Sequence, residues 1–386
     1  MKMPKIWISE SFNHKIIIRT FTIITIAASL FTSTACGTEA SSVISNKNEV
    51  VSDIKDTEDD SSNLEIIDSE SEVSETTESV INDNNTTVGS GYPELKPSYD
   101  SLPEGIVCWG DSLTFGYGGD GVTYPGTLEN LLREDGLDIP VENMGASGED
   151  SITIAGRSGG IKYVLSADVT IPAECVGTDV HLVSEDGKQV FPSIIDDVGI
   201  NECIIGGVRG VLTKWVPLSN DGDYTFVRAE AGNEVHVKSG MPVTTYAMEH
   251  FKDYISIVFV GTNGGFDSFE ELVKQQDAII NSRDKDTDRF LIIGILDTNN
   301  IDNEEYETYM KETYGERFLD ARKYFVTDAL KDAGITPTYE DQSCIENGVV
   351  PESLRVGGQH LTAKGYELLG NLVYKRLKEL NYFTIN

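Results

Sequence analysis

The sequence predicts an α/β fold with a parallel sheet, interrupted by an inserted all-β module. Apolar runs at 106–109, 254–260 and 290–295 are typical of buried parallel strands, and glycine-rich loops follow the first two. Helical patterns alternate with these runs, which is typical of βαβ units. Residues 150–247 instead show short β-branched or alternating runs without a helical period. A βαβ unit does not need so long a stretch of strands, so we expect an added lobe there.

Two segments precede the folded part. Residues 1–36 have a basic start and an apolar core, Phe21–Phe31, that is too short to span a bilayer. The small residues before Cys36 resemble a bacterial lipoprotein signal, whose mature chain begins with a lipid-modified cysteine. Ser33 stands where such signals usually carry Leu, so ordinary signal-peptide cleavage stays open. Residues 37–100 are acidic and lack an apolar period, so we expect a disordered linker.

Charge and cysteine spacing exclude some classes of function. The formal net charge is −34, which disfavours binding to nucleic acid and to anionic lipid head groups. The five cysteines form no CxxC pair, so the sequence lacks metal-ligand spacing. Cys175 and Cys203 fall in one region and could pair in an exported protein, and the sequence does not decide this.

The elements of the α/β part follow one another in a regular order. Pro125 suits the first turn of a helix, and Gly334 suits the end of one. An irregular loop is expected before Gly357. Expected strands cover 106–109, 139–143, 254–260, 290–295 and 318–320, and expected helices cover 125–133, 269–281, 304–313, 323–332 and 364–380. In the inserted module, expected strands cover 168–171, 179–183, 189–191, 203–205, 224–228 and 234–237.

Four residues occupy matching places in this pattern. Ser112, Gly148 and Asn263 follow the ends of separate predicted strands, and His360 opens the last predicted helix. The carboxyl ends of parallel strands meet at one edge of a sheet, where ligands bind. Acyl transfer needs a serine hydroxyl and a base such as histidine to take its proton. Backbone N–H groups and an Asn amide can stabilise the oxyanion that develops.

These residues lie in four sequence blocks, GDSLTFGYG, NMGASG, VGTNGG and HLTAKGY, that resemble those of the SGNH (GDSL-type) esterase and acylhydrolase family. The resemblance covers about residues 103–148 and 254–383. It implies that Ser112 is the nucleophile and His360 the base. It also implies an oxyanion hole formed by the Ser112 N–H, the Gly148 N–H and the Asn263 side chain.

The same resemblance implies a flavodoxin-like three-layer α/β/α sandwich and no metal or organic cofactor. On this basis residues 101–149 and 248–386 form the hydrolase domain. Residues 150–247 are the inserted β-rich module, which lies outside the shared pattern together with the linker.

Two features bear on the choice of catalytic residues. The family usually has Asp three residues before the histidine, but this chain has Gly357 there. Either another group orients His360, with a backbone carbonyl or water ranked ahead of Glu352, or the protein is a weakened or inactive member. A second serine, Ser158, lies in a G-x-S-x-G motif, but that motif needs a helix directly after the serine and strand-like sequence follows it.

The sequence therefore predicts an exported serine ester hydrolase without a cofactor. It would be lipid-anchored through Cys36 at the outer face of the cell membrane, or secreted. Its substrate would be a carboxylic ester, with acyl groups on cell-surface or extracellular carbohydrate as the preferred class. The alternative is a catalytically weak or inactive glycan-binding surface protein, which Gly357 favours.

Overall fold

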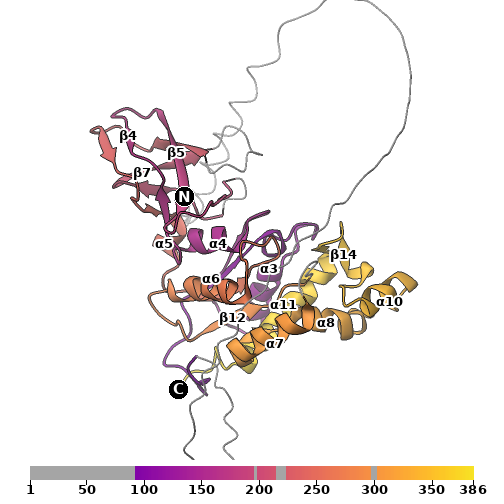
Figure 1. The fold of residues 1–386 in the computed structure, drawn as a ribbon. Helices are drawn as coiled ribbons and strands as arrows, with labels where there is room; N and C mark the ends of the chain where they lie inside the picture. Colours follow the sequence, from indigo (N-terminus) through magenta and orange to yellow (C-terminus); the bar gives the residue numbers. More distant parts are fainter. Residues whose placement is uncertain (1–91, 195–197, 214–222, 297–301) are drawn as a thin grey trace, which may run out of the picture. The chain divides into compact units, whose positions relative to one another are not determined.

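The computed structural model describes residues 92–194, 198–213, 223–296 and 302–386 (Figure 1). The expected signal segment, 1–36, and most of the expected linker lie outside the described residues. The chain divides into the units Met1–Val80 and Ile81–Asn386, and every described residue belongs to the second unit. Among the described helices, none combines the length and apolar character that crossing a membrane requires.

A five-stranded parallel sheet forms the centre of the α/β part. Its strands lie in the order β13-β12-β11-β1-β2, and each neighbouring pair is parallel. Numbered by their order within this sheet, the strands run 2-1-3-4-5, one of the two common doubly wound orders. Bounds are Ile106–Gly110 for β1, Val141–Gly145 for β2, Ile255–Phe259 for β11, Phe290–Ile293 for β12 and Phe318–Leu319 for β13. The predicted parallel sheet is confirmed.

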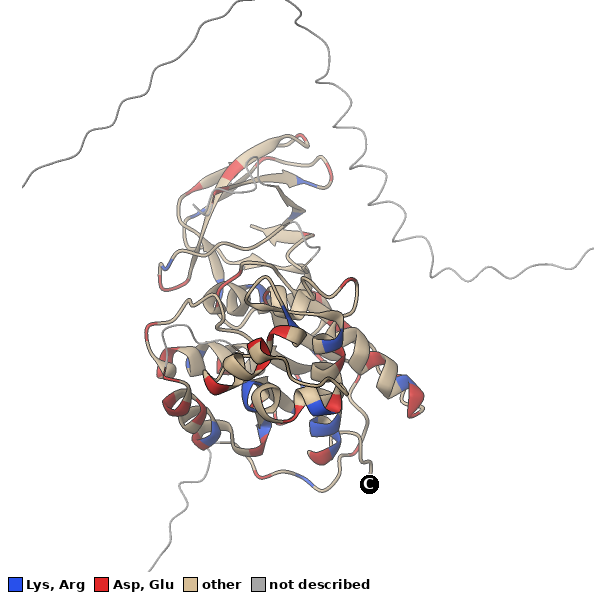
Figure 2. Cartoon of the chain, turned by 90° about the vertical axis from the view of Figure 1, so that its right-hand side faces the viewer, with Lys and Arg blue, Asp and Glu red and all other residues tan. Residues whose placement is uncertain are grey.

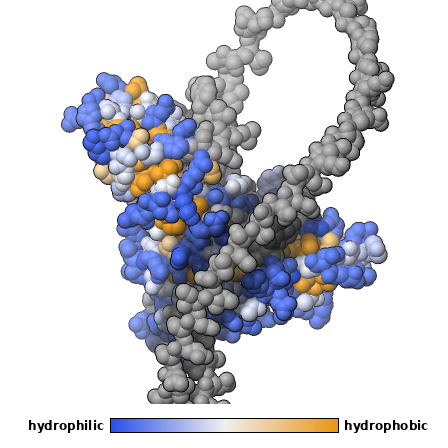
Figure 3. Space-filling model, viewed as in Figure 1, coloured by the Kyte–Doolittle hydropathy of each residue, from blue (hydrophilic) through white to orange (hydrophobic). Residues whose placement is uncertain are grey.

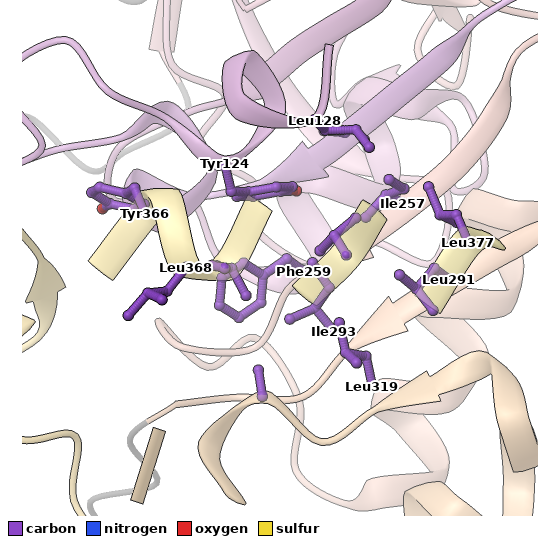
Figure 4. Packing of buried hydrophobic residues seen from close by; sticks show 14 of the residues in the cluster. Tyr124, Leu128, Ile257, Phe259, Leu291, Ile293, Leu319, Tyr366, Leu368 and Leu377 are labelled. Carbon is purple, nitrogen blue, oxygen red and sulfur yellow. The ribbon is translucent and has the colours of Figure 1, made fainter. Parts of the chain in front are cut away.

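Side chains of the central strands alternate between two cores, one on each face of the sheet. Ile106 and Cys108 of β1 belong to a cluster shared with α3, α8 and α11, whereas Val107 and Trp109 belong to another shared with α4, α6 and α7. Figure 4 shows the first cluster, in which Ile257 and Leu291 lie near Leu377. Helices therefore cover both faces, and the α/β part has three layers.

Four of the five predicted helices agree with the prediction apart from their ends. Helix α6 spans Phe269–Asn281, as predicted, whereas the helix expected at 323–332 is broken at Asp328 into α8 and α9. The loop expected before Gly357 contains α10, which begins with a capping box between Thr338 and Asp341. Bounds are Tyr124–Glu134 for α3, Asn303–Tyr314 for α7, Ala321–Thr327 for α8, Ala329–Asp332 for α9, Tyr339–Glu346 for α10 and Ala363–Glu379 for α11.

The start of the folded part lies earlier than expected. Tyr99 is buried, and its backbone N–H donates to the Thr384 carbonyl beside the C-terminus. The Tyr92 ring stacks on Tyr314 of α7. The linker boundary at residue 100 is therefore wrong, because apolar side chains among residues 92–99 already pack against the core.

The inserted segment forms a separate antiparallel sheet of six strands in the order β10-β6-β7-β8-β5-β3, with β4 and β9 as an additional pair. It has its own apolar core, in which Leu182, Phe226 and Tyr163 are buried. The predicted β module is confirmed, although β3, β7 and β10 were not predicted and 189–191 is not a strand. Bounds are Tyr163–Leu165 for β3, Val169–Ile171 for β4, Gly177–Ser184 for β5, Cys203–Ile205 for β6, Val208–Thr213 for β7, Asp223–Arg228 for β8, Val235–Val237 for β9 and Val243–Thr244 for β10.

A helix lies at the start of this segment, where the sequence predicted no helix. Residues Ser151–Ser158 form α4, whose N-cap Asp150 accepts from Thr153 N–H and whose C-cap Gly159 has φ of 90°. The segment ends in another short helix, α5, Tyr246–His250. The expectation of strands alone from residue 150 is wrong, because α4 packs on the sheet beside α6.

The cysteines are free among the described residues. Cys175 is exposed, and Cys203 is buried in the module core. The disulfide that the sequence left open is therefore not formed between these two.

Candidate active site

Ser112 follows the central strand β1 and begins the short helix α2, Ser112–Phe115. Asp111 caps this helix, and its Oδ1 accepts from Leu113 N–H at 2.9 Å. A Cβ at Gly110 would lie 2.0 Å from Thr114 Oγ1 and 2.7 Å from the Phe259 carbonyl oxygen, so no side chain fits there. The tight turn from strand to helix thus places the partly buried Ser112 hydroxyl at the carboxyl edge of the sheet.

His360 contacts this hydroxyl although it lies 248 residues later in the chain. Its Nε2 lies 2.9 Å from Ser112 Oγ. The residue belongs to β15, His360–Leu361, which pairs with β14, Arg355–Val356. His360 therefore does not open the last helix as predicted, because Thr362 caps α11 instead. A nucleophile and a base within hydrogen-bond reach are the central requirement for acyl transfer.

The loops that carry Gly148 and Asn263 are joined to each other. Asn263 Nδ2 donates to the Glu149 carbonyl oxygen at 3.0 Å, which leaves its second N–H without an acceptor among the described residues. Ser151 donates from both its N–H and its hydroxyl to the Gly264 carbonyl. These contacts fix the Asn263 amide against the backbone of Glu149, the residue that follows Gly148.

Two backbone N–H groups at this edge of the sheet are also uncommitted. Neither the Ser112 N–H nor the Gly148 N–H donates a hydrogen bond to any residue that the structure describes. A hydrogen bond from Ala146 N–H to the Gly110 carbonyl ties together the loops after β2 and β1. Three donors from three neighbouring strand ends are thus available to an incoming anionic oxygen.

A carboxylate partner for His360 is absent from the described residues. Nothing described there hydrogen-bonds to its Nδ1. Glu352 instead accepts from Arg355 Nη2 at 2.8 Å. Gly357 lies in the turn between β14 and β15 with φ of 61°, and nothing lies within 4 Å of a Cβ placed there. Burial alone lowers the pKa of His360, and no neighbouring charge opposes this.

This lowered pKa leads to a prediction about pH. Only a neutral imidazole can accept the Ser112 proton, so the acid limb of kcat/KM should have its midpoint below the ordinary histidine value of 6.5. Gly357→Asp has open space for the side chain, and Asp adopts a left-handed φ more readily than most residues. A carboxylate that reaches Nδ1 in this variant should raise this midpoint. It should also raise kcat by at least about tenfold, because that carboxylate contributes about 10,000-fold in a full triad. Profiles of kcat/KM and kcat with a small activated ester measure both effects.

Asp111 provides the control for these profiles. Burial raises its pKa to about 7, so it titrates in the same range. Asp111→Asn keeps an acceptor for the Leu113 N–H and removes that titration. If the acid limb of the kcat/KM profile disappears in Asp111→Asn, the limb reports the titration of Asp111. That result would contradict the interpretation for His360.

Sequence reasoning missed several residues of the site. Asp111 is buried within the first family-like block, and Glu149 is buried directly after the second. Only their places beside Ser112 and Gly148 could have drawn notice. Tyr117 is 57 % exposed and its ring lies 4.6 Å from that of His360. Its backbone carbonyl accepts from the Tyr366 hydroxyl, which fixes the loop that carries it.

The competing serine is not available for catalysis. Ser158 is the last residue of α4 and fully buried, and its hydroxyl donates to the Ala155 carbonyl at 2.8 Å. The helix precedes this serine, whereas a nucleophile elbow requires the helix to follow it. Ser158 therefore contributes to the end of α4.

Within the described ranges, no cluster of three or more His, Cys, Asp or Glu side chains could hold a metal ion. No protein-family model matches the chain, and no curated protein matches it. The contact between Ser112 and His360 and the donors near it are therefore the features that indicate what the site does.

Proposed function

We propose that the chain is a serine ester hydrolase of the SGNH (GDSL) type. The observation that carries this proposal is the 2.9 Å contact between Ser112 Oγ and His360 Nε2 at the carboxyl edge of the parallel sheet. The uncommitted donors at Gly148 and Asn263 supply the second requirement, a place for the oxyanion. Helices on both faces of a sheet ordered 2-1-3-4-5 support the flavodoxin-like fold of that family.

The proposed mechanism has two stages. His360 Nε2 takes the Ser112 proton as Oγ attacks the ester carbonyl, and the carbonyl oxygen becomes an oxyanion held by the three donors. The protonated His360 then gives its proton to the leaving alcohol, which leaves an acyl group on Ser112. A water molecule, deprotonated by His360, attacks this acyl ester, and the proton returns to Ser112 as the carboxylic acid departs.

The surroundings of the site suggest the class of substrate. The exposed ring of Tyr117 next to His360, and exposed Phe115 in α2, offer apolar faces on which a sugar ring can pack. Most of the surface visible in Figure 3 is hydrophilic, and apolar residues occur there in small groups. Asp and Glu positions are spread over the helices in Figure 2, consistent with the acidic net charge of −34. We propose acyl groups on extracellular carbohydrate as the substrate, in preference to long-chain lipid.

A fluorophosphonate probe tests the proposed activity. The native protein should be labelled covalently, and labelling should be lost after heat denaturation because it depends on the assembled site. Acetylated polysaccharide should release acetate, and long-chain acyl esters should be poorer substrates. Absence of both labelling and hydrolysis would favour the alternative, a glycan-binding surface protein in which the hydrolase site is silent.

Export is a further part of the proposal. We propose that residues 1–36 are removed as a signal and that Cys36 carries a lipid. Cys36→Ser should then move the protein from the membrane fraction to the soluble fraction, as immunoblots of fractionated cells would measure. Membrane association that persists in this variant would contradict the lipid anchor.

A further inference from the structure

A buried ion pair lies next to the loop that carries Gly148. Glu149 and Arg157 are 2 % and 0 % exposed. Arg157 donates from Nε and Nη2 to the same carboxylate oxygen, Glu149 Oε2, at 3.0 and 2.9 Å. Charged groups are rarely buried this completely, because leaving water costs free energy unless every polar atom finds a partner.

The remaining polar atoms of the pair join three parts of the chain. Glu149 Oε1 accepts from the Ser193 N–H of the β module at 2.7 Å. Arg157, on α4, donates to the Val198 carbonyl in the module and to the Met144 carbonyl in β2, each at 2.9 Å. The pair therefore holds the module, α4 and the strand before the Gly148 loop together.

Arg157 is also fixed against the central strand. Its guanidinium lies 5.7 Å from the centre of the Trp109 ring, which is fully buried in β1. Trp109 precedes Gly110 at the end of that strand, two residues from Asp111 and three from Ser112. The position of Arg157 is thus set by the strand that ends at the nucleophile.

We propose that Glu149 is a positioning residue of the oxyanion hole, held in place by Arg157 and by the β module. Its own carbonyl oxygen accepts the hydrogen bond that orients Asn263 Nδ2, and its preceding residue is Gly148. Two of the three oxyanion donors therefore depend on where the Glu149 backbone lies. On this proposal the module contributes to catalysis through the Ser193 and Val198 backbone. The inference rests on the proposed hydrolase function.

The test is Glu149→Gln, which keeps the shape of the side chain and an acceptor for Ser193 but removes the charge opposite Arg157. Loosening two oxyanion donors should lower kcat about tenfold or more, while KM changes less than about threefold. Glu149→Asp, which keeps the charge, should recover part of the loss in kcat. Circular dichroism and thermal unfolding show whether each variant is folded. If Glu149→Gln does not fold, kcat and KM are measured on Arg157→Lys in its place.

A matched pair at the opposite edge of the sheet provides the control. Arg289 is 2 % exposed and pairs with Asp286 at 2.5 Å, just before β12 begins. Asp286→Asn should lower the unfolding temperature and leave kcat unchanged. If Glu149→Gln behaved like Asp286→Asn, the pair would be structural only and the inference would be overturned.

A double-mutant cycle separates positioning from a general loss of activity. In the Asn263→Ala background, Glu149→Gln should cost less in kcat than it does in the native protein, because both changes act on the same donor. Full additivity of the two losses would contradict the inference. An inactive native protein would instead refute the proposed function, so the two failures are distinguishable.

Discussion

The Ser112→Ala variant is expected to hydrolyse a small activated acetyl ester no faster than the uncatalysed background. The hydroxyl is the atom that would attack the carbonyl, and in a well-studied serine protease its removal costs about a millionfold in kcat. The unfolding temperature should hardly change, because the partly buried Oγ makes one described hydrogen bond, to His360. Ester hydrolysis, fluorophosphonate labelling and thermal unfolding measure the three expectations.

Ser158→Ala is the matched control for this variant. Ser158 also lies in a short glycine-flanked motif, but its buried hydroxyl bonds to the Ala155 carbonyl. Labelling should therefore survive this change, with a small loss of stability from the broken hydrogen bond. Labelling that is retained in Ser112→Ala and lost in Ser158→Ala would show that the proposed nucleophile is wrong.

The second large effect is expected at Asn263. One Nδ2 hydrogen is held by the Glu149 carbonyl, and the other is the one that would hold the oxyanion in the proposed mechanism. Removing one such donor typically costs about 100- to 1,000-fold in kcat. Asn263→Ala should show a loss of this size with a much smaller change in KM, measured with the same acetyl ester. A change confined to KM would make Asn263 a substrate contact.

The central strands could be predicted because both faces of the sheet are covered. Every residue of β1 and β11 is buried, so their sequences are continuous apolar runs. Helix α6 could be predicted because one side faces the core and the other faces solvent. In α4, by contrast, all eight residues are buried, including Ser151, Thr153 and Arg157. Because this helix is short and its polar residues are buried, no solvent-facing side marks it. The caps Asp150 and Gly159 are the signal that could have identified it.

Some residues of the candidate site could likewise be predicted from the sequence, and others could not. Ser112, Gly148 and Asn263 could be named because chain order and strand ends place them at one edge. His360 was named from its place before the last helix, and the family-like blocks supported all four. The Glu149–Arg157 pair could not be predicted, because its partners Ser193 and Val198 contribute backbone atoms from a distant segment. The absence of a described carboxylate near His360 agrees with Gly357 at the usual acid position, but the hairpin that holds His360 was not expected.

The inserted module also has a consequence for the folding of the sheet. Strand β1 pairs with β11, which emerges from the ribosome about 150 residues later, so the central contact has a high contact order. Within the module, Leu165 N–H donates to the Met241 carbonyl, and Val164 pairs with Pro242, so its two ends lie together. Once the module folds, the loop separating β2 from β11 is already closed and its entropy no longer opposes sheet formation. We therefore expect the module to fold before the parallel sheet assembles.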